Sequence, residues 1–291
     1  MGKLIKKINP DIIHTLETQH AGYLVSDVKK NWKDKFPLWI HSNWGIDLHF
    51  FGKLQAHLPL IKQTLAMVDV FVTEGSRDDK LSKVFGFGGR TYTFPGGGGY
   101  KMPTVNYIIP SQRKKILVKG TQDEVRRGLV ALRSLERCAD ILNDYEIILY
   151  SSNEVTEIAA ELFFHGTGRK IIVKKDLSHE EMLILNSEAR LSICINMSDG
   201  LPNAMLEAMM MGAFPIQSNT SMADEWIINN KTGMIVSPED PDIIAPAIRK
   251  ALEDDAMVDS AAEINRKIIQ DKFNYDKIRE KVIEMYTQLI H

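Results

Sequence analysis

The fold is indicated by the strand-like run Leu191-Ser192-Ile193-Cys194-Ile195 and then by Ser198-Asp199-Gly200-Leu201-Pro202-Asn203-Ala204-Met205-Leu206-Glu207-Ala208-Met209-Met210-Met211-Gly212. The first run is apolar and short, which is typical of a buried strand. The second predicts a helix, because Pro202 suits a first helical turn and an apolar segment follows it. A buried strand that leads directly into a helix is the repeating unit of a parallel α/β sheet.

One acidic side chain, Glu207, lies inside that apolar helix. Its neighbours are Leu206, Ala208, Met209 and Met210, so we expect packing on most sides. A carboxylate there costs several kcal/mol unless a partner satisfies it. No Lys or Arg stands within one helical turn, so the partner comes from elsewhere. The sequence allows two candidates for this partner: the hydroxyl groups of a ligand, and an arginine distant in the sequence.

Strand-like and helical segments alternate along the whole chain, which predicts parallel sheets covered by helices on both faces. The glycine-rich break at 94–100 marks a hinge. We therefore expect a first α/β domain at 1–99, a linker at 100–113, a second α/β domain at 114–272, and a C-terminal helix at 273–291. The predicted strands are 11–16, 38–42, 70–73, 91–95, 115–119, 146–150, 171–174, 191–196, 214–217 and 234–236.

The first domain is expected to be incomplete. Only four predicted strands precede the hinge, and residues 1–8 resemble the last turns of a helix that Asn9-Pro10 ends. A truncated sheet exposes an edge strand that invites pairing with another chain. A partner chain that completes the first sheet is therefore one expectation.

Composition narrows the class of protein. The net charge of −2 over 291 residues gives no argument for nucleic-acid binding. Between 101 and 137, however, there are nine Lys or Arg and only three acids. This excess of positive charge has two interpretations: a binding site for an anionic ligand such as a diphosphate, or a solvated basic helix face. Cys138 and Cys194 lie in apolar contexts and indicate reduced core thiols in the cytoplasm. The sequence has no spanning segment, and peripheral contact with the inner face of a membrane stays open.

Ligands of open parallel sheets bind beyond the carboxyl ends of the strands. Asp199 follows such an end, Gly200 permits close backbone approach, and the helix start at Asn203 can bind an anion. The spacing fits a sugar nucleotide, with its ribose at Glu207, its diphosphate at the helix start and its hexose at Asp199. The alternative is that Asp199 caps the helix and Glu207 pairs with an arginine. The predicted donor-binding residues of this segment are Gly200, Leu201, Pro202, Asn203 and Glu207.

The segment from Asp199 to Gly233, together with Gly120 to Leu129, resembles the retaining family 4 glycosyltransferases, which have the two-domain GT-B architecture. Their signature has two glutamates separated by seven residues, and this chain has Asp199 in place of the first and Glu207 as the second. The resemblance implies that Glu207 holds the ribose and that Asp199 contacts the transferred sugar. It also implies an α/β fold in which 1–99 and 114–272 are Rossmann-like domains, the first incomplete, and the C-terminal helix at 273–291 crosses back to the first domain.

The second matching segment implies a binding site for the leaving diphosphate. The family has a Gly-Arg pair followed by a Lys, and here Arg127 corresponds to the second cation while Thr121 replaces the first. Lys119 or Arg126 is then expected to compensate. Preorganised cations at a departing phosphate supply much of the rate enhancement in such chemistry.

Two further sites follow from the resemblance. His41, after the strand 38–42, corresponds to a histidine that faces the donor across a cleft, and it is predicted to be catalytic with Asp199 and Arg127. Asp47 is a weaker candidate. Lys175 follows another strand, where relatives contact the nucleotide base. The sequence has no cluster with metal-ligand spacing, so we expect neither a metal nor another cofactor.

The expected function is a retaining glycosyltransferase that moves a sugar from a nucleoside diphosphate sugar to a glycan or lipid-linked acceptor in surface polysaccharide biosynthesis. Two alternatives remain. One is a non-catalytic or partner-dependent sugar-nucleotide-binding remnant. The other is a sugar-nucleotide epimerase of the same fold.

Overall fold

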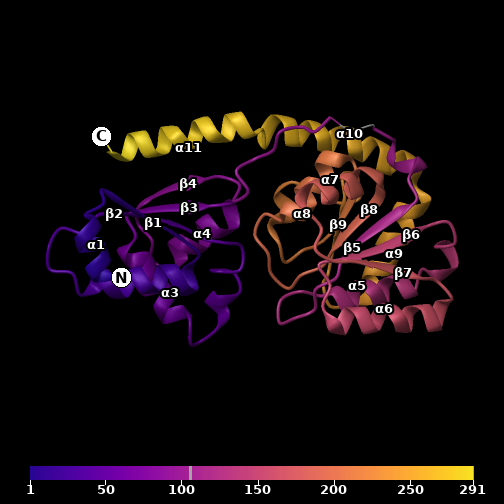
Figure 1. Cartoon of the computed structure of the whole chain (residues 1–291), viewed down its shortest axis with the longest axis horizontal. Helices are drawn as coiled ribbons and strands as arrows, with labels where there is room; N and C mark the ends of the chain where they lie inside the picture. Colours follow the sequence, from indigo (N-terminus) through magenta and orange to yellow (C-terminus); the bar gives the residue numbers. More distant parts are fainter. Residues whose placement is uncertain (105–106, 291) are drawn as a thin grey trace. The chain divides into compact units, whose positions relative to one another are not determined.

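The computed structural model describes residues 1–104 and 107–290, and the chain divides into two compact units. Unit 1 comprises Met1–Gly99 with Tyr275–His291, and unit 2 comprises Tyr100–Asn274. Each unit contains one sheet of parallel strands (Figure 1). The predicted α/β class with two parallel sheets is confirmed.

Unit 1 has a four-stranded sheet in the order β1-β2-β3-β4, so β1 and β4 form its edges. Consecutive neighbours are all parallel. The strands are β1 (Ile12–Leu16), β2 (Leu38–Ser42), β3 (Val70–Thr73) and β4 (Arg90–Thr93). The helical segments before and between them are α1 (Gly2–Ile8), η1 (Thr18–Gly22), α2 (Tyr23–Lys30), η2 (Phe51–Lys53), α3 (Leu58–Met67) and α4 (Ser76–Val84).

The two faces of this sheet are covered by different parts of the chain. Trp39 and Phe71 lie in a core cluster with Ile61 and Leu65 of α3. Alternate strand residues face the other way, and there the C-terminal helix α11 (Tyr275–Ile290) supplies Met285 to a second cluster. This helix lies along the sheet of unit 1 in Figure 1.

Unit 2 has a six-stranded parallel sheet in the order β10-β9-β8-β5-β6-β7, the doubly wound Rossmann order. Its strands are β5 (Lys115–Lys119), β6 (Glu146–Tyr150), β7 (Ile171–Lys174), β8 (Ala189–Cys194), β9 (Phe214–Ser218) and β10 (Met234–Val236). Its helical segments are η3 (Pro110–Gln112), α5 (Gly128–Glu136), η4 (Ala139–Ile141), α6 (Glu154–Thr167), α7 (His179–Glu188), α8 (Asn203–Met211), η5 (Met222–Glu225), α9 (Pro241–Glu253) and α10 (Asp255–Lys272).

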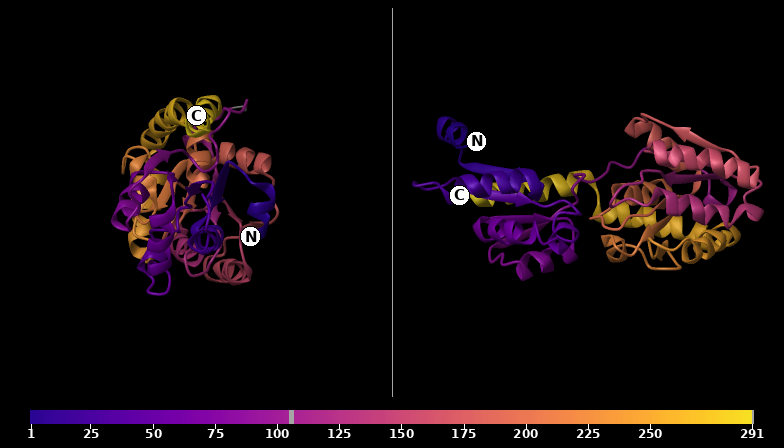
Figure 2. Two further views of the ribbon diagram at one scale, coloured as in Figure 1. Left: turned by 90° about the vertical axis from the view of Figure 1, so that its left-hand side faces the viewer. Right: turned by 90° about the horizontal axis from the view of Figure 1, so that it is seen from below.

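Helices cover both faces of this second sheet (Figure 2). On one face, α5, α6 and α9 pack in a single apolar cluster that includes Leu132, Phe163 and Ile248. On the other, Met205 and Met209 of α8 pack with Ile269 of α10. The methionine-rich run of the sequence is therefore core, which leaves Glu207 as the polar exception on α8.

Every predicted strand is present, with ends that differ by at most two residues. Part of the expected linker at 100–113 packs onto unit 2: Tyr100 bridges Asn274, and the buried Arg113 donates to backbone carbonyls of Asn186 and Ala189. Residues 105 and 106 of that linker, and residue 291 of the expected C-terminal helix, lie outside the described residues.

Candidate functional site

The candidate site of unit 2 lies where its sheet changes direction. Strands β5 and β8 are neighbours there, and the chain runs outward from them on opposite sides. Ligands of doubly wound sheets bind beyond the carboxyl ends at this point. The loop after β5 pairs with the loop after β8, because Arg127 N donates to Ile195 O at 3.0 Å and Met197 N to Val125 O at 2.6 Å. The cation-bearing and acid-bearing loops predicted from sequence are thus neighbours.

A glycine permits the close approach of helix α5 to the end of β5. Any Cβ at Gly128 would lie 2.2 Å from the carbonyl oxygen of Gly120, far inside van der Waals contact. The backbone N–H of Gly128 donates to Thr121 O at 3.0 Å, which closes the loop. The position of Arg127, immediately before this glycine, is therefore fixed by backbone contacts.

The loop after β8 presents Asp199 and an open helix start. Asp199 is half-buried and accepts hydrogen bonds from Asn196 Nδ2 and Gly200 N, each at 2.9 Å. Helix α8 begins after Pro202, and no side chain caps its first turn. Gly200, Leu201 and Pro202 are buried, whereas Asn203 is exposed. An uncapped helix start beside such a loop can bind an anion through its backbone N–H groups.

Glu207 lies one turn further along α8, and its side chain is 16% exposed. Burial raises the pKa of this carboxyl group, whereas His179 and Lys119 favour its charged form. Its described partner is His179 Nε2 at 3.1 Å, and the side chain of His179 is 65% exposed. The internal arginine that the structural alternative requires is absent from the described contacts of Glu207.

Sequence reasoning missed His179. It is the first residue of α7, which begins with a capping box formed by Ser178 and Glu181. The motif Ser178-His179-Glu180-Glu181 after the strand β7 carries this signal, because it predicts a helix start at the carboxyl edge of the sheet.

The predicted cations of the site are held mostly by acidic side chains. Arg127 Nε lies 2.9 Å from Glu239 Oε1, and Arg126 Nη1 lies 2.7 Å from Asp123 Oδ2. Lys175 Nζ lies 2.8 Å from Glu157 Oε2. The guanidinium of Arg127 also donates to the carbonyl oxygen of Asp123, which fixes its orientation. Lys119, the last residue of β5, lies within electrostatic reach of Glu207.

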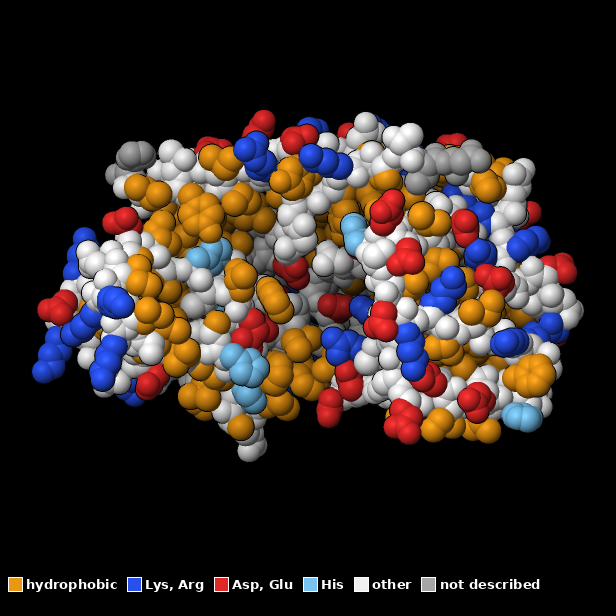
Figure 3. All heavy atoms as spheres, in the orientation of Figure 1, with side chains coloured by type: hydrophobic (Ala, Val, Ile, Leu, Met, Phe, Trp, Pro, Cys, Tyr) orange, Lys and Arg blue, Asp and Glu red, His pale blue; other side chains and the backbone are white. Residues whose placement is uncertain are grey.

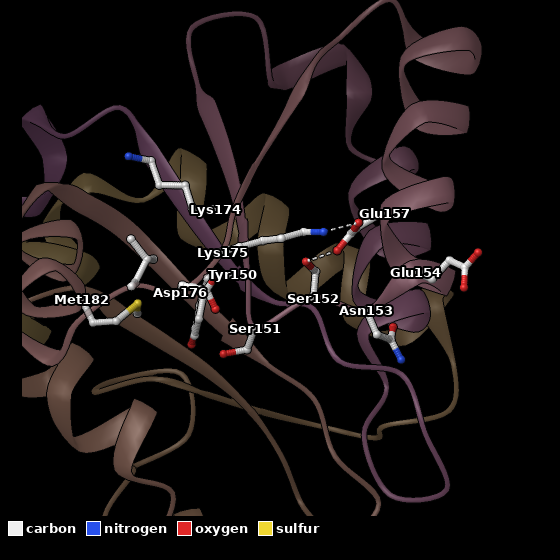
Figure 4. Close-up of a pocket in the computed structure, with 11 residues that line it drawn as sticks. Tyr150, Ser151, Ser152, Asn153, Glu154, Glu157, Lys174, Lys175, Asp176 and Met182 are labelled. Carbon is white, nitrogen blue, oxygen red and sulfur yellow. Dashed lines mark hydrogen bonds and ion pairs between the residues drawn. The ribbon is translucent and has the colours of Figure 1, made fainter.

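A cavity of about 570 Å³ opens at the ends of β6 and β7 (Figure 4). Its lining residues are Tyr150, Ser151, Ser152, Asn153, Glu154, Glu157, Lys174, Lys175, Asp176, Leu177 and Met182. Ser151 and Asp176 have left-handed backbone conformations, with φ of 47° and 53°. Such strained non-glycine residues cluster at functional sites.

This cavity adjoins the carboxylate of α8. Burial raises the pKa of Tyr150, and Glu207 is among the nearby groups that raise it further. In Figure 4, Glu157 accepts from both Lys175 and Ser152, which ties the two strand ends together. Of these lining residues, Lys175 was predicted as a site residue, from the segment 174–177 that follows a strand. The lining residues that follow β6 carry no motif that would have indicated them.

In unit 1, the expectation that His41 faces an open cleft is wrong. Its side chain is fully buried, with Nδ1 2.8 Å from Thr15 Oγ1 and Nε2 2.9 Å from Thr18 Oγ1. Burial lowers the pKa of His41 to about 3, so the ring is neutral. Ile40 faces α11, so the next residue, His41, faces the opposite side of the sheet. Its neighbour Trp39 faces that same side, where it packs against α3. Its catalytic role stays a prediction without support from its contacts.

Asp47 is likewise part of the interior. It accepts hydrogen bonds from Thr18 N and Trp44 N, each at 2.9 Å, and from Thr18 Oγ1 at 3.1 Å. Burial raises its pKa to about 7. Because Thr18 Oγ1 donates to Asp47, it accepts from Nε2 of His41, which assigns the neutral tautomer of that ring. These contacts indicate a structural role for both side chains.

Within the described residues, no group of three or more His, Cys, Asp or Glu is arranged to hold a metal ion.

The two Rossmann-like units, with an uncapped helix start and a partly buried glutamate at the switch point of the second sheet, define the GT-B class of fold. The chain belongs to the glycosyl transferases group 1 family, whose model matches residues 109–270. A second model, glycosyl transferase 4-like, matches residues 1–74.

Curated relatives match the chain over about a third of its length. The chain is 28% identical over 92 residues to the capsular polysaccharide biosynthesis glycosyltransferase CapM of Staphylococcus aureus, and the match covers 32% of this chain and 24% of CapM. It is 26% identical over 110 residues to glycogen synthase of Mycobacterium tuberculosis, covering 38% of this chain and 27% of that protein. These matches span about a quarter of each relative.

Solved structures resemble the chain over its whole length. Sucrose-phosphate synthase from Thermosynechococcus elongatus has a TM-score of 0.81 at 18% identity, covering 99% of this chain and 75% of that one. Anabaena HepE in complex with UDP-glucose has a TM-score of 0.76 at 12% identity, covering 98% and 81%. The pneumococcal O-GlcNAc transferase GtfA, with UDP and GlcNAc, has a TM-score of 0.79 at 13% identity, covering 100% and 60%. At these identities the likeness establishes the fold.

Proposed function

We propose that the chain is a retaining glycosyltransferase that transfers a sugar from a nucleoside diphosphate sugar to a glycan or lipid-linked acceptor in surface polysaccharide biosynthesis. The observation that carries the proposal is the carboxylate of Glu207. It is mostly buried, its pKa is raised, and its described partner is the exposed His179 rather than an internal arginine. Such a group can exchange His179 for the two hydroxyls of a ribose at little cost.

The surroundings of Glu207 suit the other parts of a donor. The cavity beside it has room for a nucleobase, and the uncapped start of α8 suits a diphosphate. Arg127, with Lys119 and Arg126, would neutralise the leaving phosphate, while Asp199 would bind hydroxyls of the transferred sugar. Lys175 lines the cavity and would contact the base.

The relatives support the choice of substrate class. CapM is named for capsular polysaccharide biosynthesis, and HepE and GtfA bind UDP-glucose, or UDP and GlcNAc, in their structures. We extend the proposal to a cytoplasmic location, which two buried, unpaired cysteines support. A nucleic-acid partner has no support in the net charge of −2.

One observation favours a second function, a non-catalytic or partner-dependent binder of sugar nucleotides. Arg127 is engaged by Glu239, and Thr121 stands where relatives have a cation, so the leaving group has less positive charge available. Nucleotide release separates the possibilities. A transferase releases nucleotide only with an acceptor, a binder releases none, and an epimerase converts the donor without an acceptor.

Thermal denaturation with a panel of nucleoside diphosphate sugars tests the binding site. We expect at least one of them to raise the melting temperature of the intact chain, and Glu207→Ala to abolish the shift. Glu180→Ala, which removes an exposed carboxylate of α7, is the matched control and should keep it. If no sugar nucleotide stabilises the protein, or if Glu207→Ala responds like the parent, the proposed site is wrong.

A second variant separates binding from transfer. Asp199→Ala should impair transfer more than nucleotide affinity, because the proposed contact is to the sugar and not to the nucleotide. Equal losses of transfer and affinity would contradict the assigned role.

A further inference from the structure

The first helix of unit 1 exposes an apolar stripe. Met1, Leu4 and Ile8 lie on one side of this short segment by their spacing of three and four residues. Their exposed fractions are 53%, 52% and 62%, whereas Ile5 on the adjacent side is buried. An apolar helix stripe usually faces a core. Here it faces solvent.

Packing fixes the direction of this stripe. Ile5 is 5% exposed, and the Lys6 ammonium lies 5.1 Å from the centre of the Trp32 ring. A Cβ on Gly2 would touch Val28 and Trp32, which shows that α1 lies against the end of α2 and the loop after it. At its C-terminus, Asn9 adopts a left-handed conformation and its N–H donates to Ile5 O. The outward stripe is therefore a feature of the packed helix.

Lysines surround the stripe. Residues 1–10 and 28–36 together contain seven lysines and one acid, Asp34. Lys3 and Lys7 on α1, and Lys33 and Lys35 on the adjoining loop, are exposed. Figure 3 shows Lys and Arg side chains gathered at the left-hand end of the view, where unit 1 carries α1. We name α1 with residues 32–36 the basic apolar surface.

A second exposed stripe provides a contrast within the same chain. On α6, Val155, Ile158 and Leu162 are 48% to 53% exposed, with a similar helical spacing. Their neighbours on that helix are Glu154, Glu157 and Glu161. The two stripes are similar in apolar character and opposite in charge, so an anionic partner would distinguish them.

We propose that the basic apolar surface binds the surface of a bilayer that contains anionic phospholipid. Apolar side chains framed by lysines are the composition of helices that lie in the membrane interface. No helix of the described chain is long and apolar enough to cross a bilayer, so the contact is peripheral. This inference concerns a surface of unit 1, whereas the proposed donor site belongs to unit 2, and it does not depend on that function.

The location of the basic apolar surface leaves the carboxyl ends of the unit 1 strands accessible. Helix α1 leads through Asn9 and Pro10 into the amino end of β1, so it lies on the side of the sheet where its parallel strands begin. The loops after β1, β2 and β3 are on the opposite side, where the strands end. A bilayer bound at α1 therefore does not need to cover those loops.

The test measures co-sedimentation of the intact chain with vesicles of phosphatidylcholine alone or mixed with phosphatidylglycerol. We expect binding only to the mixed vesicles, and weaker binding at higher salt because screening shortens the reach of the lysines. Each lysine near an anionic surface is worth about fivefold in affinity. Lys3→Gln with Lys7→Gln should therefore weaken binding on the order of thirtyfold.

The apolar part is tested with a matched pair of double variants. Leu4→Ser with Ile8→Ser should weaken binding on the order of tenfold or more, because their insertion is lost. Ile158→Ser with Leu162→Ser removes as many exposed apolar side chains from α6 and should leave binding unchanged. Melting temperatures confirm that all variants are folded.

Several results would overturn the proposal. These are equal binding to both vesicle types, no binding to either, or equal losses from the α1 and α6 variants. A dimer in sedimentation velocity that Leu4→Ser with Ile8→Ser dissociates, without vesicle binding by the parent, would assign the surface to a second copy of the chain instead.

Discussion

The loops at the carboxyl ends of the strands use the same residue types in different ways in the two sheets. In unit 1, the buried carboxylates of Asp47 and Asp78 tie together the loops after β1, β2 and β3. Asp47 joins Thr18 and Trp44, while Asp78 accepts from Asn43 Nδ2 and Arg77 Nε, each at 2.8 Å. In unit 2, the pairs Glu207–His179 and Arg127–Glu239 each include one well-exposed partner. The first edge is closed by its own side chains, whereas the second has partners that a ligand can replace.

The difference teaches that the free-energy cost of breaking such a pair depends on burial of the partner as much as on burial of the acid. Breaking a pair between two buried groups leaves an unsatisfied atom without water, which costs about 1–3 kcal/mol for each donor or acceptor. An exposed partner regains water when it is displaced, so the exchange costs far less. The predictions below test this contrast.

The largest effect is expected on stability, from Asp47→Ala. It leaves the N–H groups of Thr18 and Trp44 and the hydroxyl of Thr18 unpaired in the interior, so the free energy of unfolding should fall by about 4 kcal/mol. Asp199→Ala makes the same change at the half-buried edge of unit 2 and should cost less than about 1 kcal/mol. Urea unfolding of both variants gives the two values. Equal losses would remove the distinction between the edges.

The next effect concerns catalysis in the proposed reaction. Arg127→Ala removes a preorganised cation from the leaving phosphate and should lower kcat about a hundredfold. Arg133→Ala removes an exposed arginine from α5, the helix that Arg127 immediately precedes, and should leave kcat unchanged. The comparison requires steady-state rates with the donor identified by thermal denaturation. A normal kcat for Arg127→Ala would favour the structural pairing with Glu239 as its only role.

The sequence predicted the strands, their order of appearance and the position of Glu207, because apolar runs and one acid within them are local signals. It did not predict the direction of His41. Asn43 N still pairs with Val72 O beyond β2, so His41 is inside the ladder and its direction follows from alternation with Ile40. His179 was missed for a different reason. Its contact with Glu207 joins two helices, and such a contact depends on their packing.

Stability should respond to pH through unit 1, with two opposing contributions. The pKa of Asp47 is raised from 3.8 to about 7, so its contribution to stability is present below the lower value and is lost as pH rises toward 7. The pKa of His41 is lowered from 6.5 to about 3, so its contribution is present above 6.5 and is lost as pH falls. Where these two pH windows overlap, from about 3.8 to 6.5, the two slopes oppose each other.

Two conservative variants separate those slopes. The stability of the parent minus that of Asp47→Asn should fall by up to about 1.4 kcal/mol per pH unit as pH rises from about 4 to 7. The corresponding difference for His41→Gln should rise with pH up to 6.5. Urea unfolding at several pH values measures both. A pH-independent difference for either variant would show that its group titrates as it does in the unfolded chain.

The smallest effect is expected at the exposed partner of Arg127. Glu239→Gln keeps the size of the side chain but removes its charge, so Arg127 becomes more available to a diphosphate. Since ion pairs with an exposed member are worth less than about 1 kcal/mol, the affinity for the sugar nucleotide should rise only two- to threefold. Titration of both proteins with the same sugar nucleotide measures this change. A tenfold gain would mean that Glu239 competes strongly with the ligand, whereas a loss would mean that Glu239 orients Arg127 for binding and is part of the site itself.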